Sequence, residues 1–159
     1  MVELRRVDEH NIWKLIKLSV REDQRGFVAT NTQSLLEAYV TVTAGGVALP
    51  FGIYDGDEPV GFLMIGYGTT GDEDEPGIAD GSYCIWRFMI DARYQGKGLG
   101  RQGMLAALEY VRTRPCGEAE HCWLSYEPEN HGAKALYESL GFCENGEMCC
   151  DEIVSVLRL

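Results

Sequence analysis

The sequence predicts an α/β fold in which a mixed β-sheet carries helices on both faces. The chain has 159 residues, of which 45% are hydrophobic, enough for one domain over residues 1–159 with a core of its own. The predicted elements run strand, two helices, three strands, helix, strand, helix and two strands. The strand-helix-strand unit in the middle favours parallel pairing, whereas strands joined by short turns favour antiparallel pairing.

The N-terminal quarter of the chain predicts one strand and two helices. Residues 2–7 form the expected strand, and Asp8 is a good N-cap residue for the helix that follows. The inward face of this helix is expected to carry Ile12, Leu15, Ile16 and Ser19. A second helix is expected over residues 34–40.

Two strands over residues 48–54 and 59–67 are predicted to form a hairpin. Asp55-Gly56-Asp57 lies between them, and an Asp-Gly pair between apolar runs is a strong hairpin signal. Residues 68–81 are rich in glycine and acid, including the acidic run at 72–75. We expect a solvated loop there.

The next predicted elements surround a glycine-rich segment. A strand of mostly apolar and aromatic residues covers 83–90, the glycine-rich segment covers 93–100, and a helix covers 99–112. The apolar side of this helix is expected to carry Leu105, Leu108 and Val111.

The C-terminal part predicts a strand, a helix and two final strands. The first strand covers residues 122–126, and Asn130 is expected to cap a helix that ends at Leu140. Gly141 follows as a typical C-terminal glycine. The last two strands are expected over 142–148 and 153–159.

Charge excludes several classes of protein. The chain has 14 basic and 25 acidic residues and a formal net charge of −11, whereas a nucleic-acid binder needs positive charge. An acidic chain suits a cationic partner. No apolar run approaches the roughly 20 residues that span a bilayer. Residues 1–6 lack the apolar core of a signal peptide, so we expect a cytoplasmic protein without membrane contact.

The six cysteines agree with a reducing compartment if they are thiols. Cys116, His121 and Cys122 have some resemblance to metal ligands, but no second pair has ligand spacing, so no metal site is predicted. The neighbouring Cys149 and Cys150 are interpreted as two ordinary thiols at a strand end, the alternative being a strained disulfide between them.

The glycine-rich segment predicts an anion site. Gly96, Gly98 and Gly100 let the backbone approach a ligand closely, and they stand where a strand leads into a helix. The free N–H groups of the first helical turn and the helix dipole favour an anion at that point. Lys97 and Arg101 add positive charge, so the chemistry favours a phosphate or pyrophosphate.

Other interpretations of the segment fit less well. A P-loop needs Ser or Thr after Gly-Lys, but Gly98 follows Gly96-Lys97. Residues 98–103 match the dinucleotide pattern G-x-G-x-x-G, yet that pattern directly follows its strand and opens a large doubly wound domain. Here eight mostly polar residues intervene from Asp91 on. A glycine-rich turn without a ligand is the remaining alternative.

Two motifs in order resemble the GNAT superfamily of acetyl-CoA-dependent N-acetyltransferases. Residues 93–98, Arg-Tyr-Gln-Gly-Lys-Gly, match the family's cofactor loop and follow a strand that ends in Met-Ile-Asp. The second motif comprises Asn130, Ala133, Leu136-Tyr137 and Leu140-Gly141-Phe142. The resemblance covers residues 48–159 and implies a mixed, mostly antiparallel sheet of about six to seven strands.

A narrower resemblance is to the small bacterial spermine/spermidine acetyltransferases. It is carried by Gln24, Phe27-Val28-Ala29, Asn31, residues 34–38 and residues 124–130. This resemblance implies a polyamine as the acetyl acceptor.

The family resemblance implies contacts with acetyl-CoA. Backbone groups on the strand before the loop would lie along the pantetheine arm, the loop amides would hold the pyrophosphate, and two residues of the later helix would lie near the cofactor. These residues are Phe88, Met89, Ile90, Gln95, Gly96, Lys97, Gly98, Leu99, Gly100, Arg101, Asn130 and Lys134. The other interpretation of Asn130 is a plain helix cap. A backbone N–H of Met89 or Ile90 would stabilise the oxyanion.

The same resemblance places Tyr137 at the general-acid position, where a phenol protonates the leaving thiolate. Its alternative is a core residue with its hydroxyl at the rim. Some relatives carry a carboxylate on the strand before the loop, but Trp86 and Arg87 stand there. Glu127 is therefore the candidate base, directly or through water, with a surface acid as its alternative.

The acidic balance favours a small polyamine as acceptor. Glu22, Asp23 and Glu37 are the candidate acceptor-binding acids, together with the acidic loop. An aminoglycoside, an amino acid or a protein amine is the rival acceptor, and a non-catalytic acyl-CoA-binding module is the rival function. A homodimer is a further expectation, with Thr41, Val42 and the last two strands as its candidate surface.

Overall fold

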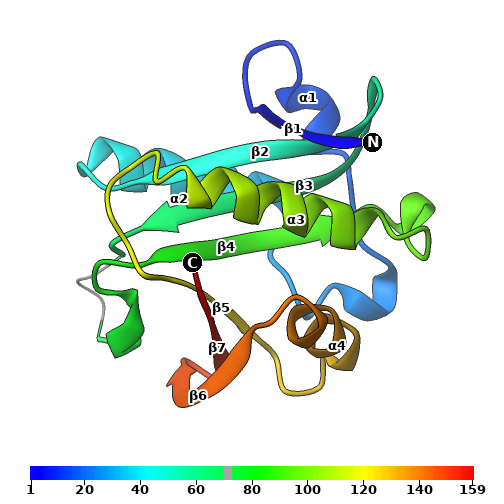
Figure 1. The fold of residues 1–159 in the computed structure, drawn as a ribbon. Coiled ribbons are helices and arrows are strands. Elements are labelled where there is room, and N and C mark those ends of the chain that lie inside the picture. Colours follow the sequence, from blue (N-terminus) through cyan, green and yellow to red (C-terminus); the bar gives the residue numbers. More distant parts are fainter. Residues whose placement is uncertain (70–72) are drawn as a thin grey trace.

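A computed structural model describes residues 1–69 and 73–159. Within them, seven strands form one sheet in the order β1-β2-β3-β4-β5-β7-β6 (Figure 1). The strands are β1 (Val2–Arg6), β2 (Ala48–Asp55), β3 (Glu58–Tyr67), β4 (Tyr83–Ile90), β5 (His121–Tyr126), β6 (Cys143–Cys149) and β7 (Glu152–Arg158). The helices are α1 (Ile12–Leu15), α2 (Asn31–Thr43), α3 (Leu99–Arg112) and α4 (His131–Ser139), with short 3₁₀ turns at Glu22–Gln24, Gly77–Ala79 and Ala92–Tyr94. The predicted mixed sheet is confirmed.

The pairing of β4 with β5 is the structural feature that opens the sheet. These strands are parallel, and they pair only at Tyr83↔Cys122 and Cys84↔Trp123. Beyond that point β4 continues beside β3 and β5 continues beside β7. The β3–β4 register shifts at Trp86, because Met64 pairs with Arg87 and the next residue pairs with Ile85. Such a bulge bends a strand and re-aims its side chains.

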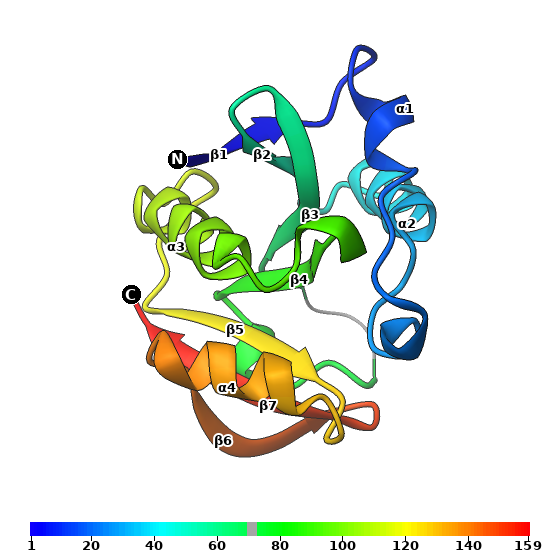
Figure 2. The same cartoon turned by 90° about the vertical axis from the view of Figure 1, so that its right-hand side faces the viewer.

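Helices cover both faces of the sheet (Figure 2). On one face α3 and α4 pack over a core that includes Ile53, Leu108 and Tyr137. On the other face α1 and α2 pack over a smaller core around Leu15 and Phe62. The buried residues of α3 are mostly apolar, whereas those of α2 are Asn31, Ser34 and Ala38.

Three sequence predictions about helices were wrong in detail. The helix after Asp8 is only one turn long, at Ile12–Leu15, and Ser19 lies exposed beyond it. The second helix is longer than predicted, because the Thr30 side chain caps it three residues earlier by accepting from Gln33 N. On α3 the buried face is centred on Met104, Leu108 and Val111, whereas Leu105 is 42% exposed.

The turns follow the predicted chemistry where the structure describes them. The β2–β3 hairpin closes with Asp55 opposite Glu58, so Gly56 and Asp57 form a two-residue turn, and Gly56 has φ +62°. Residues 70–72 of the predicted acidic loop lie outside the described residues, and the described part contains the turn at Gly77–Ala79. None of the helices in the described part of the chain has the length and apolar character needed to cross a bilayer.

Candidate active site

The glycine-rich loop turns the chain from β4 into α3. Gly96 and Gly98 both have φ +77°, a conformation that side chains with a Cβ rarely adopt. Gly98 is the N-cap of α3, so the free N–H groups of the first turn follow it directly. A Cβ at either glycine would have no atom within 4 Å, so the space beside the loop is open to a ligand.

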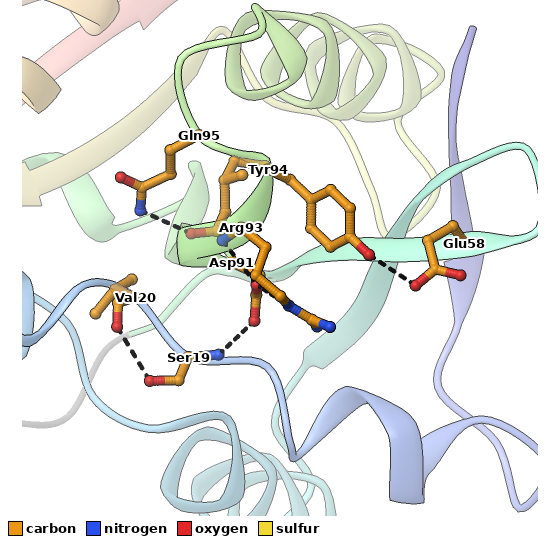
Figure 3. Close-up of polar contacts among 8 residues, drawn as sticks. Ser19, Val20, Glu58, Asp91, Arg93, Tyr94 and Gln95 are labelled. Carbon is orange, nitrogen blue, oxygen red and sulfur yellow. Dashed lines mark hydrogen bonds and ion pairs between the residues drawn. The ribbon is translucent and has the colours of Figure 1, made fainter.

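Asp91 fixes the start of this loop (Figure 3). Its Oδ1 accepts from the backbone N and the Nε of Arg93, at 3.0 and 2.8 Å, and its Oδ2 accepts from Ser19 N at 3.0 Å. Burial opposes the charge of Asp91, but these hydrogen bonds outweigh it and lower its pKa. Tyr94 Oη donates to Glu58 at 2.8 Å, and Gln95 Nε2 donates to Ile90 O at 2.9 Å. The loop is thus tied to three other segments.

A cavity of about 890 Å³ lies where β4 and β5 separate. It receives residues from the segment between α1 and α2, from β4, from the glycine-rich loop, from α4 and from the β6–β7 turn. The loop, α4, the α1–α2 segment and the β6–β7 turn therefore all line a single cavity. A cavity of this volume is typical of a small-molecule binding site.

Ten of the predicted site residues line this cavity. They are Phe88, Met89, Ile90, Gln95, Gly96, Leu99, Gly100, Glu127, Asn130 and Tyr137. Asn130 is also a helix cap, because its Oδ1 accepts from Ala133 N at 3.3 Å. The cap interpretation and the cavity position therefore hold for the same side chain.

The predicted basic residues of the cofactor site lie outside the cavity lining. Lys97 Nζ is 5.6 Å from the centre of the Tyr94 ring, and Arg101 Nη1 donates to Ser139 Oγ at 2.7 Å. Lys134 Nζ lies 3.2 Å from a carboxylate oxygen of Glu144. Gly98 acts through its backbone conformation, as described above.

The three predicted acceptor-binding acids also lie outside the residues that line the cavity. Glu22 and Asp23 are exposed on the 3₁₀ turn whose last residue, Gln24, does line it. Glu37 Oε2 accepts a hydrogen bond of 2.5 Å from Arg87 Nη2. The charge of Glu37 is thus engaged by a cavity-lining arginine.

Four charged cavity residues were not predicted: Arg25, Arg87, Asp151 and Glu152. Glu152 begins β7, and its Oε1 accepts from Ser125 Oγ at 2.8 Å. The two final strands were predictable, but their pairing with β5 was not. Glu152 lies at the cavity because of the register between β5 and β7. The signal available in the sequence was the acidic pair after Cys150 at a predicted turn.

Tyr137 is held on the cavity-facing side of α4. It is 8% exposed, and its ring packs against Tyr126 and Phe142. Burial, then the negative charge of Glu152, then Tyr126, raise the pKa of Tyr137 well above its ordinary value of 10.0. The hydroxyl is therefore protonated at neutral pH and able to donate.

Two of the cysteines, Cys149 and Cys150, line the cavity. All six cysteines are free, and burial raises the pKa of the Cys122 thiol to about 12 and that of Cys149 to about 11. In the described part of the chain, no group of three or more His, Cys, Asp or Glu side chains is arranged to hold a metal ion.

The fold and the loop define a class of protein. The profile of the acetyltransferase (GNAT) family matches residues 13–142, and the chain belongs to this family. It is an N-acetyltransferase that uses acetyl-CoA. The open, positive-φ loop at the start of α3 and the adjoining cavity fit that co-substrate.

Individual relatives are similar over nearly the whole chain. The spermine/spermidine N(1)-acetyltransferase of Bacillus subtilis (strain 168) is 29% identical over 147 residues, which are 92% of this chain and 91% of the relative. An aminoglycoside acetyltransferase, AAC(6′)-Ib, in complex with coenzyme A superposes with a TM-score of 0.79 at 24% identity, covering 99% of this chain and 95% of that one. The PaiA N-acetyltransferase of Thermoplasma acidophilum, in complex with coenzyme A, has a TM-score of 0.68 at 14% identity, covering 100% and 99%.

Proposed function

We propose that this enzyme acetylates a small polyamine such as spermine or spermidine. The observation that carries the proposal is the charge of the cavity. Glu127, Asp151 and Glu152 line it, and of the two arginines there, Arg87 is paired with Glu37. Carboxylates in a partly enclosed cavity attract the ammonium groups of a polyamine. The spermine/spermidine relative supports the same acceptor.

The loop at residues 95–101 is proposed to hold the pyrophosphate of acetyl-CoA. Backbone N–H groups of the first turn of α3 point at the open space beside Gly96 and Gly98, and the helix dipole favours negative charge there. Lys97 and Arg101 are exposed beside the loop and would meet the outer phosphates by side-chain movement. The pantetheine arm would lie along Phe88, Met89 and Ile90, where β4 has no pairing with β5.

Tyr137 is proposed as the general acid of the reaction. The amine attacks the thioester carbon, and the bond from that carbon to sulfur breaks. A buried phenol that stays protonated donates its proton, or a strong hydrogen bond, to the leaving thiolate. A backbone N–H of Met89 or Ile90 would stabilise the oxygen of the attacked carbonyl.

Acetylation of a mixed amine pool tests the acceptor. The protein is incubated with acetyl-CoA, spermine, spermidine, an aminoglycoside, amino acids, a lysine peptide and monoamines of similar size, and products are identified by mass spectrometry. Acetylated polyamine is expected as the main product. Preference for an aminoglycoside or a peptide would overturn the proposal while leaving the family assignment intact, and CoA release without any acetylated amine would contradict both.

Other parts of the functional picture stay predictions. These are a single catalytic domain over residues 1–159, a cytoplasmic location and a homodimer. Glu22 and Asp23, which are next to the cavity-lining Gln24, stay predicted acceptor-binding acids. Glu37 also stays a predicted acceptor-binding acid, because it pairs with the cavity-lining Arg87.

A further inference from the structure

Glu152 and Glu127 face each other at one edge of the cavity. Antiparallel pairing of Tyr126 with Ile153 places the residue after β5 opposite the first residue of β7. Both carboxylates line the cavity. Carboxylates that share a site favour binding of a proton or a cation between them.

Glu152 is the better oriented of the two. Ser125 Oγ donates to its Oε1 at 2.8 Å, and this bond leaves the lone pairs of Oε2 for a substrate N–H. Glu152 also lines a second, smaller cavity of about 140 Å³ that shares Arg87 and Ser125 with the first. Glu152 therefore lies at the border between the large cavity and a small recess.

The backbone that carries Glu152 is strained. Cys149 pairs with Glu152, so Cys150 and Asp151 form the β6–β7 turn, and Cys150 has φ +54°. A non-glycine residue rarely adopts this conformation, and such residues cluster at functional sites. The turn thus holds the start of β7 at the cavity against a local cost.

The electrostatic surroundings of Glu152 come from several elements. The titratable and charged groups that face it are Arg87, Glu127, Tyr137, Cys149, Cys150 and Glu75. Burial and then the charge of Glu127 raise the pKa of Glu152, while the hydrogen bond from Ser125 and the charge of Arg87 oppose that rise. A base works best when its pKa approaches the working pH.

We propose that Glu152 takes the proton from the acceptor's attacking ammonium group, with Ser125 as its positioning residue. The inference deepens the proposed function by naming the proton acceptor, and it requires only that the acceptor is an amine. One N–H bond of the ammonium breaks, and the proton passes to Oε2 of Glu152. The freed lone pair attacks the thioester carbon, the bond to sulfur breaks, and the thiolate takes the proton of Tyr137. A second nitrogen proton returns to Tyr137, and Glu152 releases its proton to solvent.

The pH dependence of Glu152→Gln tests this role. A primary amine titrates near pH 10, so its neutral fraction grows about tenfold per pH unit between pH 6 and 9. The variant can use only amine that is already neutral in solution. The wild-type enzyme instead removes the proton from the bound ammonium group. At pH 7 we expect kcat/KM for the amine to fall by about 10²-fold or more. The ratio of wild type to variant should then shrink steeply as pH rises, with unchanged acetyl-CoA affinity.

Two further variants decide between roles. The Glu152→Gln variant keeps an oxygen that can accept the hydrogen bond from Ser125. Its matched control is Glu129→Gln, because Glu129 is exposed and lies outside the cavity lining. Ser125→Ala removes a hydrogen bond that lowers the pKa of Glu152, so the rising limb of the wild-type profile should move to higher pH. This readout serves if the Gln variant fails to fold.

A pH-independent ratio for Glu152→Gln would overturn the proposal, as would an unmoved limb in Ser125→Ala. The proposal would also be overturned if the ratio of wild type to Glu127→Gln shrank steeply as pH rises, because Glu127 would then be the base. The best acceptor of the amine pool is used throughout. If the wild-type enzyme does not acetylate polyamines, the polyamine assignment is overturned. The role of Glu152 is then tested with the amine that the enzyme does acetylate.

Discussion

The side-chain amide of Gln95 donates a hydrogen bond of 2.8 Å to Oε1 of Gln24. Gln95 belongs to the proposed pyrophosphate loop, and Gln24 lies in the segment between α1 and α2, which also lines the cavity. The same Gln95 amide also donates to Ile90 O at the end of β4. One side chain therefore connects the loop to the α1–α2 segment and to the end of β4.

Gln24→Ala should weaken the binding of both substrates. A hydrogen bond between neutral side chains contributes about 1 kcal/mol, which corresponds to roughly a fivefold change in an equilibrium constant. We expect the KM values for acetyl-CoA and for the amine to rise by about that factor, with kcat little changed. Gln102→Ala on the exposed side of α3 is the control. A rise confined to the amine would contradict a connection between the loop and the α1–α2 segment.

Gly98→Val should remove acetyl-CoA binding without unfolding the protein. At φ +77° a branched side chain is strained, and relief of that strain would turn the first amides of α3 away from the phosphates. We expect the Kd for acetyl-CoA to rise at least about tenfold, measured by calorimetry. Gly45→Val introduces the same kind of strain at φ +88° beyond the end of α2. Equal affinity in the two variants would refute the loop assignment.

Tyr137→Phe should lower kcat and leave both KM values nearly unchanged. The hydroxyl acts on the leaving sulfur, and a positioned acid contributes about 10²–10⁴-fold. Because burial raises the pKa of Tyr137, no loss of the acid should be seen in the wild-type profile below pH 10.0, its ordinary pKa. Single-turnover rates separate chemistry from product release, with Tyr110→Phe as control. An unchanged single-turnover rate would return Tyr137 to a core role.

The cofactor half of the site was predictable because its signals are local. Three closely spaced glycines, the amphipathic pattern after Leu99 and the Asn130 cap each depend on a few neighbouring residues. Strand β4 and helix α3 start and end where the sequence predicted them. Local backbone chemistry therefore carried this part of the prediction.

The positions of other parts of the cavity lining depend on contacts between distant segments. The predicted first helix stops after one turn because Leu15 and Leu18 both enter the core and Ser19 N donates to Asp91, 72 residues away in the chain. Likewise, Glu152 reaches the cavity only through the register of β5 with β7. Periodicity within one segment contains neither relationship, so these residues were missed or misplaced.

Asp91 should make part of the stability depend on acid pH. Its folded-state pKa lies below the ordinary value of 3.8, since the hydrogen bonds from Arg93 and Ser19 outweigh the opposing effect of burial. A depressed pKa contributes stability above the unfolded-state pKa, and this contribution is lost as pH falls through the folded-state value.

Asp91→Asn should therefore lower the free energy of unfolding by about 1.5–3 kcal/mol at pH 7. The difference from wild type should shrink below about pH 4, where the wild-type carboxylate becomes protonated. Urea unfolding across the pH range measures it, with Asp57→Asn on a fully exposed side chain as the control. A difference that is constant with pH would mean that the charge of Asp91 does not contribute.

Polyamines should be acetylated better than monoamines of similar size, and salt should weaken the preference. Each additional ammonium can meet Glu127, Asp151 or Glu152 in the cavity. A partly exposed pair contributes under about 1 kcal/mol, so two or three contacts give roughly tenfold in kcat/KM. Screening shortens to about 3 Å at 1 M salt, which removes most of this attraction. Asp151→Asn should reduce the preference at low salt, whereas Asp80→Asn should not. Monoamines that match polyamines at low salt would show that these carboxylates do not select the acceptor.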